Sequence, residues 1–259
     1  MVIPVYKELF NLTDRVAIVT GGSRGIGEAI ALALSEFGAK VVLSSRKIEG
    51  LNAVKEKIEA QGGRAHCIPA HMGDLDSLQA VVDGTLEVHG TIDILVNNAA
   101  TNPIFGPIMD AEEAAWDKIM DVNLKGIFFL TKAAGRVMLE KGKGSVVNIS
   151  TEAAVRPAPF LGVYSISKAG VDMVTKTFAQ EWGPQGIRVN GIAPGLVQTK
   201  FSQALWANDE ILQQALSRVP LGRMAQASEI AGLAVFLASD AANFITGQTV
   251  AVDGGSMLL

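Results

Sequence analysis

The chain has very little of several residue types that mark special classes of protein. Cys67 is the one cysteine among 259 residues, which excludes an internal disulfide framework and suits a reducing compartment. The three histidines, His66, His71 and His89, have no cysteine partners at metal-site spacing, so no metal site is predicted. Although 49% of the residues are hydrophobic, no apolar run approaches the roughly 20 residues that a membrane-spanning helix needs.

The net charge of the chain is also small. The formal net charge is -4 and the basic residues form no stripe, which argues against nucleic acid as the main partner. The first residues lack the pattern of a signal peptide, and residues 256–259 lack a peroxisomal address of the S-K-L type, so the cytoplasm is the expected compartment. A chain of this length can bury a large core, and one domain spanning residues 1–259 is expected.

Strand-like apolar runs alternate with helical patterns along the whole chain. The predicted strands cover residues 16–20, 40–44, 64–69, 92–96, 145–150, 187–192 and 249–252, and the predicted helices cover 28–37, 50–61, 77–89, 112–141, 164–182 and 228–238. This order predicts an α/β fold of the Rossmann type, a doubly wound parallel sheet with helices on both faces. A ligand is then expected beyond the carboxyl ends of the strands, with the irregular stretch 196–224 as a substrate lid.

A glycine-rich turn follows the first predicted strand. Gly21 permits a tight turn, and Gly25 and Gly27 let the backbone approach a pyrophosphate. The next helix would present free N–H groups and a partial positive charge to the phosphates. The spacing, T-G-x-x-x-G-I-G, differs from the common G-x-G-x-x-G fingerprint. Its position between a strand and a helix favours a dinucleotide site over a merely structural turn.

Tyr164 and Lys168 stand four residues apart in the predicted helix 164–182, and therefore on one face of it. A nearby ammonium group favours the phenolate, which lowers the pKa of a tyrosine from its usual value of about 10. Such a phenol can exchange a proton with a substrate oxygen. A lone Y-x-x-x-K pattern is common in ordinary amphipathic helices, so the pair gains weight only beside the glycine turn.

These motifs together resemble the short-chain dehydrogenase/reductase family. The residues that carry the resemblance are, in chain order, 20–27, Asn97-Asn98-Ala99-Ala100, Asn123, Tyr164 with Lys168, and Pro194-Gly195, and it extends from about Leu12 to Gly255. Within the family, segments 44–47, 97–103 and 193–196 look most like the DHRS4-type carbonyl reductases. The resemblance implies an oxidoreductase that transfers a hydride between a nicotinamide cofactor and a substrate carbon.

The resemblance also implies four catalytic roles. Tyr164 is expected to donate a proton in reduction and accept one in oxidation, and Lys168 to lower its pKa and bind the nicotinamide ribose. Asn123 is expected to hold a water of the proton relay. Where the family has a serine that polarises the substrate oxygen, this chain has Thr151. Threonine keeps a hydroxyl donor, but β-branching restricts its direction, and Ser150 remains the alternative.

Further cofactor contacts follow from the same resemblance. Asn97 and Ala99 are expected under the adenosine ribose, and Pro194 and Gly195 beside the nicotinamide. The remaining expected contacts are Gly21, Ser23, Arg24, Gly25, Ile26 and Gly27 in the glycine turn, Ser45 and Arg46 after the second strand, Val197 near the carboxamide, Thr199 near the phosphates, and Tyr164 with Lys168. His71 replaces the family's usual aspartate, which leaves the adenine contact open.

The end of the second predicted strand bears on the choice of cofactor. Dinucleotide folds that prefer NAD commonly place an acidic residue there, and by resemblance this chain has Ser45, followed by Arg46 and Lys47. Arg46 can bind a 2′-phosphate through paired charge-assisted hydrogen bonds, and Arg24 can approach it from the glycine turn. NADP(H) is therefore predicted over NAD(H), with ordinary surface charges as the alternative interpretation of both arginines.

The substrate is expected to be a small carbonyl compound or the corresponding alcohol. Phe201, Leu205 and Trp206 of the predicted lid are candidate lining residues, which favours an apolar or aromatic compound, although such a stripe is equally often packing. Three functions compete: an NADPH-dependent carbonyl reductase, a secondary-alcohol or hydroxysteroid dehydrogenase, and a nucleotide-binding scaffold with weak activity. Only Thr151 favours the scaffold.

Association into a homotetramer is expected from the resemblance, in which two long helices pack against partner subunits. Phe128, Phe129, Val171 and Phe178 on the corresponding helices exceed what one sheet face needs. Their alternative role is ordinary core packing.

Overall fold

Seven parallel strands form one continuous sheet in the computed structural model, which describes residues 5–258, apart from the side chains of residues 204 and 205. The strands are β1 (Val16–Thr20), β2 (Lys40–Ser45), β3 (Arg64–Pro69), β4 (Ile94–Asn97), β5 (Gly144–Ile149), β6 (Ile187–Pro194) and β7 (Thr249–Val252). Their order is β3-β2-β1-β4-β5-β6-β7, so the winding direction reverses between β1 and β4. The predicted doubly wound sheet is confirmed, and the reversal marks where such sheets bind ligands.

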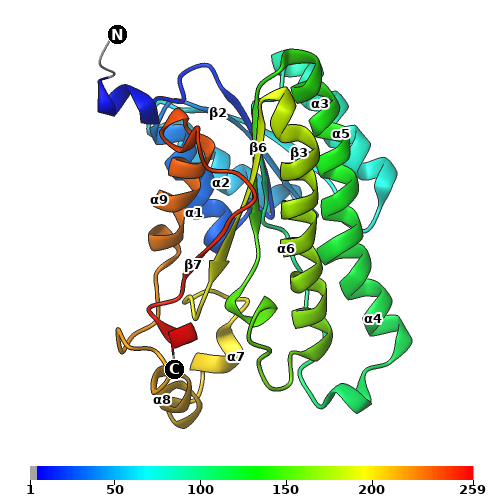
Figure 1. Cartoon of the computed structure of the whole chain (residues 1–259), viewed down its shortest axis with the longest axis vertical. Helices are drawn as coiled ribbons and strands as arrows, with labels where there is room; N and C mark the ends of the chain where they lie inside the picture. The colour runs from blue at the N-terminus through cyan, green and yellow to red at the C-terminus, as the bar shows by residue number, and fades with distance from the viewer. Residues whose placement is uncertain (1–4, 259) are drawn as a thin grey trace.

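Helices cover both faces of the sheet (Figure 1). On one face lie α1 (Gly25–Glu36), α2 (Ile48–Ala60) and α9 (Ala227–Ala238), and on the other lie α3 (Leu75–His89), α5 (Gly126–Lys141) and α6 (Gly162–Trp182). Every residue of β1, β4 and β5 is buried. Because both faces are covered, these strands have continuous apolar sequences in place of an alternating pattern.

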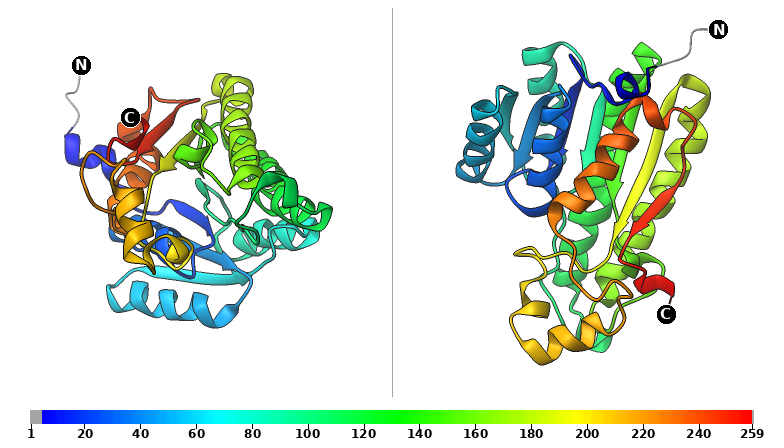
Figure 2. Two further views of the ribbon diagram at one scale, coloured as in Figure 1. Left: turned by 90° about the horizontal axis from the view of Figure 1, so that it is seen from below. Right: turned by 90° about the vertical axis from the view of Figure 1, so that its left-hand side faces the viewer.

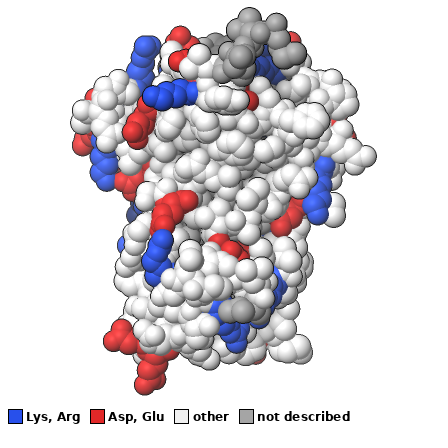
Figure 3. Space-filling model, turned by 60° about the vertical axis from the view of Figure 1, so that its left-hand side comes forward, with Lys and Arg blue, Asp and Glu red and all other residues white. Residues whose placement is uncertain are grey.

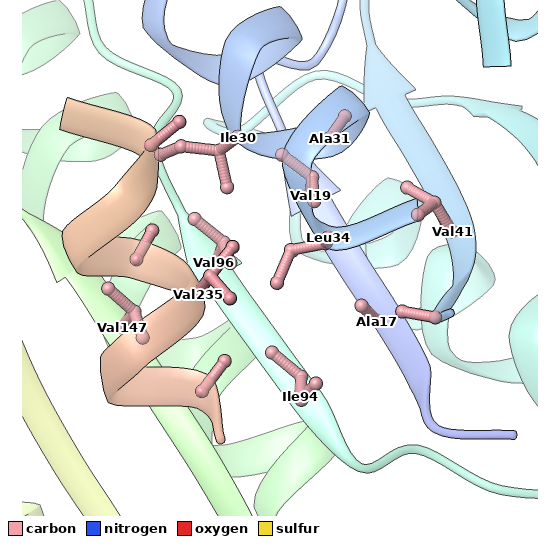
Figure 4. Close-up of a cluster of buried hydrophobic side chains, with 14 of the residues drawn as sticks. Ala17, Val19, Ile30, Ala31, Leu34, Val41, Ile94, Val96, Val147 and Val235 are labelled. Carbon is pink, nitrogen blue, oxygen red and sulfur yellow. The ribbon is translucent and has the colours of Figure 1, made fainter. Parts of the chain in front are cut away.

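The core on the first face joins two helices that are far apart in the sequence (Figure 4). Ile30 and Leu34 of α1 share one buried cluster with Val235 of α9, and the central strands contribute Val96 and Val147. Each of these side chains has no more than 2% of its surface exposed. The core thus fixes the helix after the glycine turn against the last long helix of the chain.

One predicted helix, residues 112–141, is divided in the structure. It consists of α4 (Glu113–Met120), one turn of π-helix η3 (Asp121–Lys125), and α5. The widened turn contains Asn123, whose side chain is fully buried. Single π turns inside α-helices are frequent at functional sites, and sequence periodicity does not reveal them.

The predicted lid lies beyond the carboxyl ends of the strands (Figures 1 and 2). It contains α7 (Gln203–Trp206) and α8 (Asp209–Leu216), which begins at the side-chain cap Asn208. The two ends of the lid meet, because Val197 pairs with Ala225 in an isolated parallel bridge. The lid is therefore a loop whose two ends are joined by backbone pairing.

Short helices complete the described chain. They are η1 (Tyr6–Phe10), η2 (Ile108–Asp110), η4 (Glu152–Ala154), η5 (Gly183–Gln185), η6 (Asp240–Ala242) and η7 (Ser256–Leu258). Among all helices of residues 5–258, none combines the length and the apolar character that crossing a bilayer requires.

Candidate functional site

The turn after β1 and the turn after β4 are joined directly, next to the point where the strand order reverses. Asn98 Nδ2 donates hydrogen bonds to the carbonyl oxygens of Thr20 (2.9 Å) and Gly21 (3.2 Å). The Thr20 hydroxyl accepts from the backbone N–H groups of Asn98 (3.0 Å) and Ala99 (3.2 Å). The two predicted cofactor segments therefore form one rigid floor.

The glycine turn opens at the N-terminus of α1. Gly21 and Gly25 adopt φ of +63° and +60°, a region that other residues rarely occupy. Arg24 is the N-cap residue, and no described side chain caps the helix. The first N–H groups of α1 thus remain available to an external acceptor. Thr199 of the lid faces this turn, since a Cβ on Gly25 would lie 3.4 Å from Thr199 Cγ2.

Tyr164 and Lys168 lie one helical turn apart on α6, and both are buried. Lys168 Nζ donates to the Ile149 carbonyl at the end of β5 (2.6 Å) and lies 5.9 Å from the centroid of the Tyr164 ring. Burial lowers the pKa of Lys168 to about 8. Burial also raises the pKa of Tyr164, which is opposite to the lowering expected from Lys168, because desolvation of the phenolate dominates.

The two candidate polarising hydroxyls, on Ser150 and Thr151 after β5, differ in burial and in hydrogen bonding. Ser150 is 3% exposed, and its hydroxyl has no hydrogen-bond partner among the described residues. Thr151 is only partly buried, and its hydroxyl donates to the Pro194 carbonyl (3.4 Å) and accepts from the Ala153 N–H (3.3 Å). Successive residues of the extended chain face opposite sides, so the geometry favours Thr151 over Ser150 for a substrate contact.

Two of the predicted asparagines are held by protein partners. Asn123 Oδ1 accepts from the Thr101 N–H (2.8 Å), while its Nδ2 donates to the Thr101 carbonyl (2.9 Å) and to the Ser167 hydroxyl (3.2 Å). Asn97 turns its side chain into the protein interior, where Nδ2 donates to Thr131 (2.9 Å) and Asn148 (2.8 Å). The Asn97 side chain therefore joins β4, β5 and α5 and does not reach toward a ligand.

The end of β2 carries exposed positive charge. Arg46 and Lys47 are exposed, and they line an open cleft with Ile48, Glu49 and Pro69. Arg24 is exposed at the neighbouring glycine turn. Ser23 lies against the start of α2, since a Cβ on Gly50 would be 3.1 Å from Ser23 Cβ. Of the two arginines predicted to bind a 2′-phosphate, Arg46 thus lines the cleft and Arg24 is exposed on the glycine turn.

The lid brings one of its three candidate aromatic or aliphatic residues to the tyrosine. The Phe201 ring centroid is 5.8 Å from that of Tyr164, and Phe201 is exposed. Trp206 instead donates from Nε1 to the Thr199 carbonyl (3.2 Å), which holds it against the backbone of the lid. The side chain of Leu205 lies outside the described part of the structure.

Two aromatic residues that the sequence analysis did not single out stand on neighbouring loops. Phe105 follows β4, Phe160 follows β5, and their ring centroids are 5.5 Å apart. Phe160 has φ of +66°, an unfavourable conformation for a bulky residue, and its carbonyl accepts from the Gly106 N–H (3.2 Å). Their position after carboxyl ends of adjacent parallel strands is the signal that could have identified them.

Side chains with metal-binding chemistry do not gather at this site. Across residues 5–258, the described His, Cys, Asp and Glu side chains form no group of three or more that could hold a metal ion. His71 Nδ1 accepts from the Gly73 N–H (3.1 Å), which keeps its ring within its own turn.

Comparisons with known proteins agree with this arrangement. A family model described as enoyl-(acyl carrier protein) reductase matches residues 21–257. The chain is 42% identical over 245 residues to dehydrogenase/reductase SDR family member 4 of Oryctolagus cuniculus, which covers 95% of this chain and 94% of the relative.

Two solved structures extend the similarity to the whole fold. A short-chain type dehydrogenase/reductase from Mycobacterium ulcerans has a TM-score of 0.92 and 35% identity, over 96% of this chain and 91% of that one. A gluconate 5-dehydrogenase from Burkholderia cenocepacia, in complex with NADP and tartrate, has a TM-score of 0.94 and 34% identity, over 98% and 99%.

Proposed function

Because this chain belongs to the short-chain dehydrogenase/reductase family, we propose that it is an NADP(H)-dependent enzyme that reduces ketones or aldehydes to alcohols. The observation that carries the proposal is the buried pair of Tyr164 and Lys168, one helical turn apart where β5 ends. A buried phenol beside a buried ammonium group is costly for stability and is typical of a catalytic site.

The residues around the glycine turn fit a dinucleotide. A Cβ on Gly27 would lie 2.3 Å from the Gly21 carbonyl oxygen, so the turn closes tightly and leaves the N-terminus of α1 open. That N-terminus offers uncapped N–H donors, and Thr199 faces it from the lid. Lys168 Nζ has three protons and makes a single hydrogen bond within residues 5–258, so it can also bind ribose hydroxyls.

The bound nicotinamide supplies the hydride in this chemistry. Tyr164 supplies the proton to the substrate oxygen as the carbonyl becomes an alkoxide. The raised pKa of Tyr164 keeps the phenol protonated at neutral pH, which suits an acid in the direction of reduction. The Thr151 hydroxyl has one proton, so it would exchange its 3.4 Å hydrogen bond to the Pro194 carbonyl for one to the same substrate oxygen. The Lys168 ammonium would stabilise the phenolate that remains. Asn123 fixes the loop after β4 against α6 through Thr101 and Ser167.

Phe201 and the pair of Phe105 and Phe160 favour an apolar or aromatic substrate. Phe201 stacks toward Tyr164, and all three rings are exposed at the end of the sheet that holds the tyrosine. Rings in such positions bind apolar groups by removing them from water.

Oxidation of a hydroxy acid is the second candidate. A solved relative is a gluconate 5-dehydrogenase crystallised with NADP and tartrate, which is a polar, anionic compound. A site for such compounds needs cationic or hydrogen-bonding side chains near Tyr164, and the candidates are Arg156 in the loop after β5 and Lys200 and Arg218 in the lid. The exposed aromatic residues count against this candidate.

The deciding experiment follows nicotinamide absorbance in two assays. In the first, the enzyme receives NADPH or NADH with aliphatic, cyclic and aromatic ketones and aldehydes; in the second, it receives NADP+ or NAD+ with gluconate and simple secondary alcohols. We expect rapid consumption of NADPH with carbonyl compounds. Turnover confined to gluconate would replace the proposal with the hydroxy-acid dehydrogenase. Binding of cofactor without turnover of any compound would leave the scaffold.

The preference for NADP(H) is tested at Arg46. Replacing Arg46 with glutamine should raise the Kd for NADPH by about 10- to 100-fold, since a charge-assisted hydrogen bond contributes about 1.5–3 kcal/mol. The Kd for NADH should not change, because NADH lacks the 2′-phosphate. Arg64→Gln is the matched control, because Arg64 begins β3 whereas Pro69, which lines the cleft with Arg46, ends it. This variant should leave both Kd values unchanged. Equal weakening of both cofactors would show that Arg46 does not bind the phosphate. Fluorescence titration gives both constants.

The role of Thr151 is tested by comparing hydroxyl and methyl groups. Thr151→Val keeps the shape and removes the donor, so kcat should fall by about 10²-fold, as when one oxyanion donor is lost. Thr151→Ser should retain at least wild-type kcat, because it keeps the hydroxyl and removes a methyl. Ser150→Ala should have no effect, since that buried hydroxyl has no partner among the described residues. A large loss in Ser150→Ala instead would transfer the role to Ser150.

We also propose that the protein is a homotetramer. Phe128 and Phe129 on α5 are exposed, as is Met173 on α6, whereas Val171 and Phe178 belong to the buried core. On another side, β7 is an edge strand, and uncharged atoms cover most of the face seen in Figure 3, between small groups of acidic and basic side chains. An open strand edge and apolar helix faces favour association. Light scattering should give about four times the chain mass of 27.2 kDa.

A further inference from the structure

The last turn of the described chain, residues 253–257, lies at the same end of the molecule as the lid (Figures 1 and 2). It follows β7 directly and begins with Asp253. Asp253 shapes the turn, because its carboxylate accepts hydrogen bonds from the N–H groups of Gly255 (2.9 Å) and Met257 (2.9 Å) and from the Ser256 hydroxyl (3.1 Å). Three hydrogen bonds within residues 253–257 thus shape the turn.

This turn binds the segment that leaves β6 and the segment that leaves the lid. The Gly195 N–H donates to the Val252 carbonyl (3.0 Å), which pairs the turn after β6 with the end of β7. The Leu221 N–H donates to the Gly254 carbonyl (3.1 Å), which fastens the exit of the lid. Gly195 also lies against the turn itself, since a Cβ there would be 2.8 Å from Asp253 Cα. The segment that carries Pro194 and Gly195 and the exit of the lid therefore share one support.

The same turn binds the loop after β5. The Ser256 hydroxyl makes a hydrogen bond with the carboxyl group of Glu152, the residue that follows Thr151. Arg156, four residues further along that loop, donates from its guanidinium to the Ser256 carbonyl (3.2 Å). Ser256 is buried at 9% exposure, so water competes little for these bonds. The first half of the loop, residues 151–156, is thus attached to one residue near both of its ends.

The single proton of the Ser256 hydroxyl limits the hydrogen bonds that this residue can donate. Its hydroxyl has one proton and contacts two carboxyl groups, those of Glu152 and Asp253, so it can donate to only one of them. Burial and the charge of Asp253 raise the pKa of Glu152, while the hydrogen bonds from the turn keep that of Asp253 low. The hydroxyl therefore stands between two acidic side chains and can donate its proton to only one of them at a time.

We propose that Ser256 is a positioning residue that holds the Thr151 loop and the exit of the lid in register on the substrate side of the site. Its catalytic part rests on the proposed reductase function. A displacement of the order of 1 Å in a group that contacts the reacting atoms can cost about 10²-fold in rate. Within the described residues Ser256 makes no hydrogen bond to the glycine turn or α1, so we expect the Kd for the cofactor to be independent of it.

The test combines hydrogen exchange with kinetics on the full chain. In Ser256→Ala, backbone exchange should speed up in both segments 151–156 and 219–222, while the glycine turn 20–27 keeps wild-type exchange. The KM for a ketone should rise and kcat/KM should fall by about tenfold, with the Kd for NADPH unchanged within about twofold. Ser256→Thr keeps the hydroxyl and should recover the wild-type values. Ser228→Ala, an exposed serine of α9, is the matched control.

Glu152→Leu breaks the same contact from the other side. It should speed backbone hydrogen exchange at residues 219–222, although no hydrogen bond joins Leu221 to residue 152. In the double variant, exchange should be no faster and KM no higher than in the more affected single variant. Faster exchange confined to residues 253–258, or an unchanged KM in a variant that exchanges faster, would overturn the proposal. If no carbonyl compound is turned over by the wild type, the reductase function fails, and the exchange data alone still decide whether Ser256 couples the two segments.

Discussion

Replacing Tyr164 with phenylalanine is expected to lower kcat by about 10³-fold, the size of the loss when a positioned general acid is removed. Phenylalanine keeps the ring, so its packing against Phe201 and its place 5.9 Å from Lys168 Nζ are retained. Only the hydroxyl is lost. Fluorescence titration should therefore give an unchanged Kd for NADPH, while the loss of nicotinamide absorbance with a ketone nearly stops.

The chain provides its own control for this experiment. Tyr6, the other tyrosine, is 74% exposed on η1, and Tyr6→Phe should leave kcat at the wild-type value. If Tyr164→Phe retained more than about a tenth of the wild-type kcat, the phenol would not be the proton donor, and the proposed chemistry would be wrong. Circular dichroism spectra of the two variants should be indistinguishable, since neither substitution changes packing volume.

The sequence could predict the pair of Tyr164 and Lys168, but it could not predict the directions in which their pKa values shift, because these depend on burial. A spacing of four residues puts both side chains on one face of α6, and this follows from helix geometry alone. The direction of the tyrosine pKa depends on how much protein covers the phenol, which the spacing does not contain. Desolvation raises the pKa of Tyr164 and lowers that of Lys168, so each group is held toward its neutral form.

The parallel sheet was predictable because its signal is local and repeated. Apolar runs bounded by glycine turns and helical patterns occur all along the chain, and their alternation permits few topologies. The π turn at residues 121–125 was not predictable, because the apolar periodicity on either side of it reads as one helix. Asn123 was identified through the family resemblance, and its role in catalysis stays a prediction.

Contacts between distant segments account for what the sequence missed. Ser256 meets Glu152 across 104 positions, and Phe105 meets Phe160 from loops after two different strands. No local pattern encodes such pairs; they follow from the order of strands in the sheet. The same order turns the Asn97 side chain inward, where Thr131 and Asn148 bind it. The expected contact of Asn97 with the adenosine ribose stays a prediction.

Replacing Gly126 with alanine is expected to lower the free energy of unfolding by about 3 kcal/mol, at the upper end of what overpacking costs. Gly126 is the first residue of α5, and a Cβ there would lie 2.0 Å from the Met72 carbonyl oxygen. Backbone on both sides prevents relief by a rotamer change. For a domain of this size the melting temperature should fall by about 10 °C, which thermal unfolding monitored by circular dichroism measures.

The same substitution should also affect the site, because α5 continues the π turn that holds Asn123. Moving α5 away from Met72 loosens the bonds from Asn123 to Thr101, so kcat should fall even at temperatures where the variant is folded. Gly183→Ala is the matched control: its φ is -52°, no described atom lies within 4 Å of the added methyl, and its melting temperature should equal that of the wild type or exceed it slightly. A Gly126→Ala protein as stable as this control would mean that α5 and the loop after β3 can separate without cost, and the close approach would then not be what fixes the π turn.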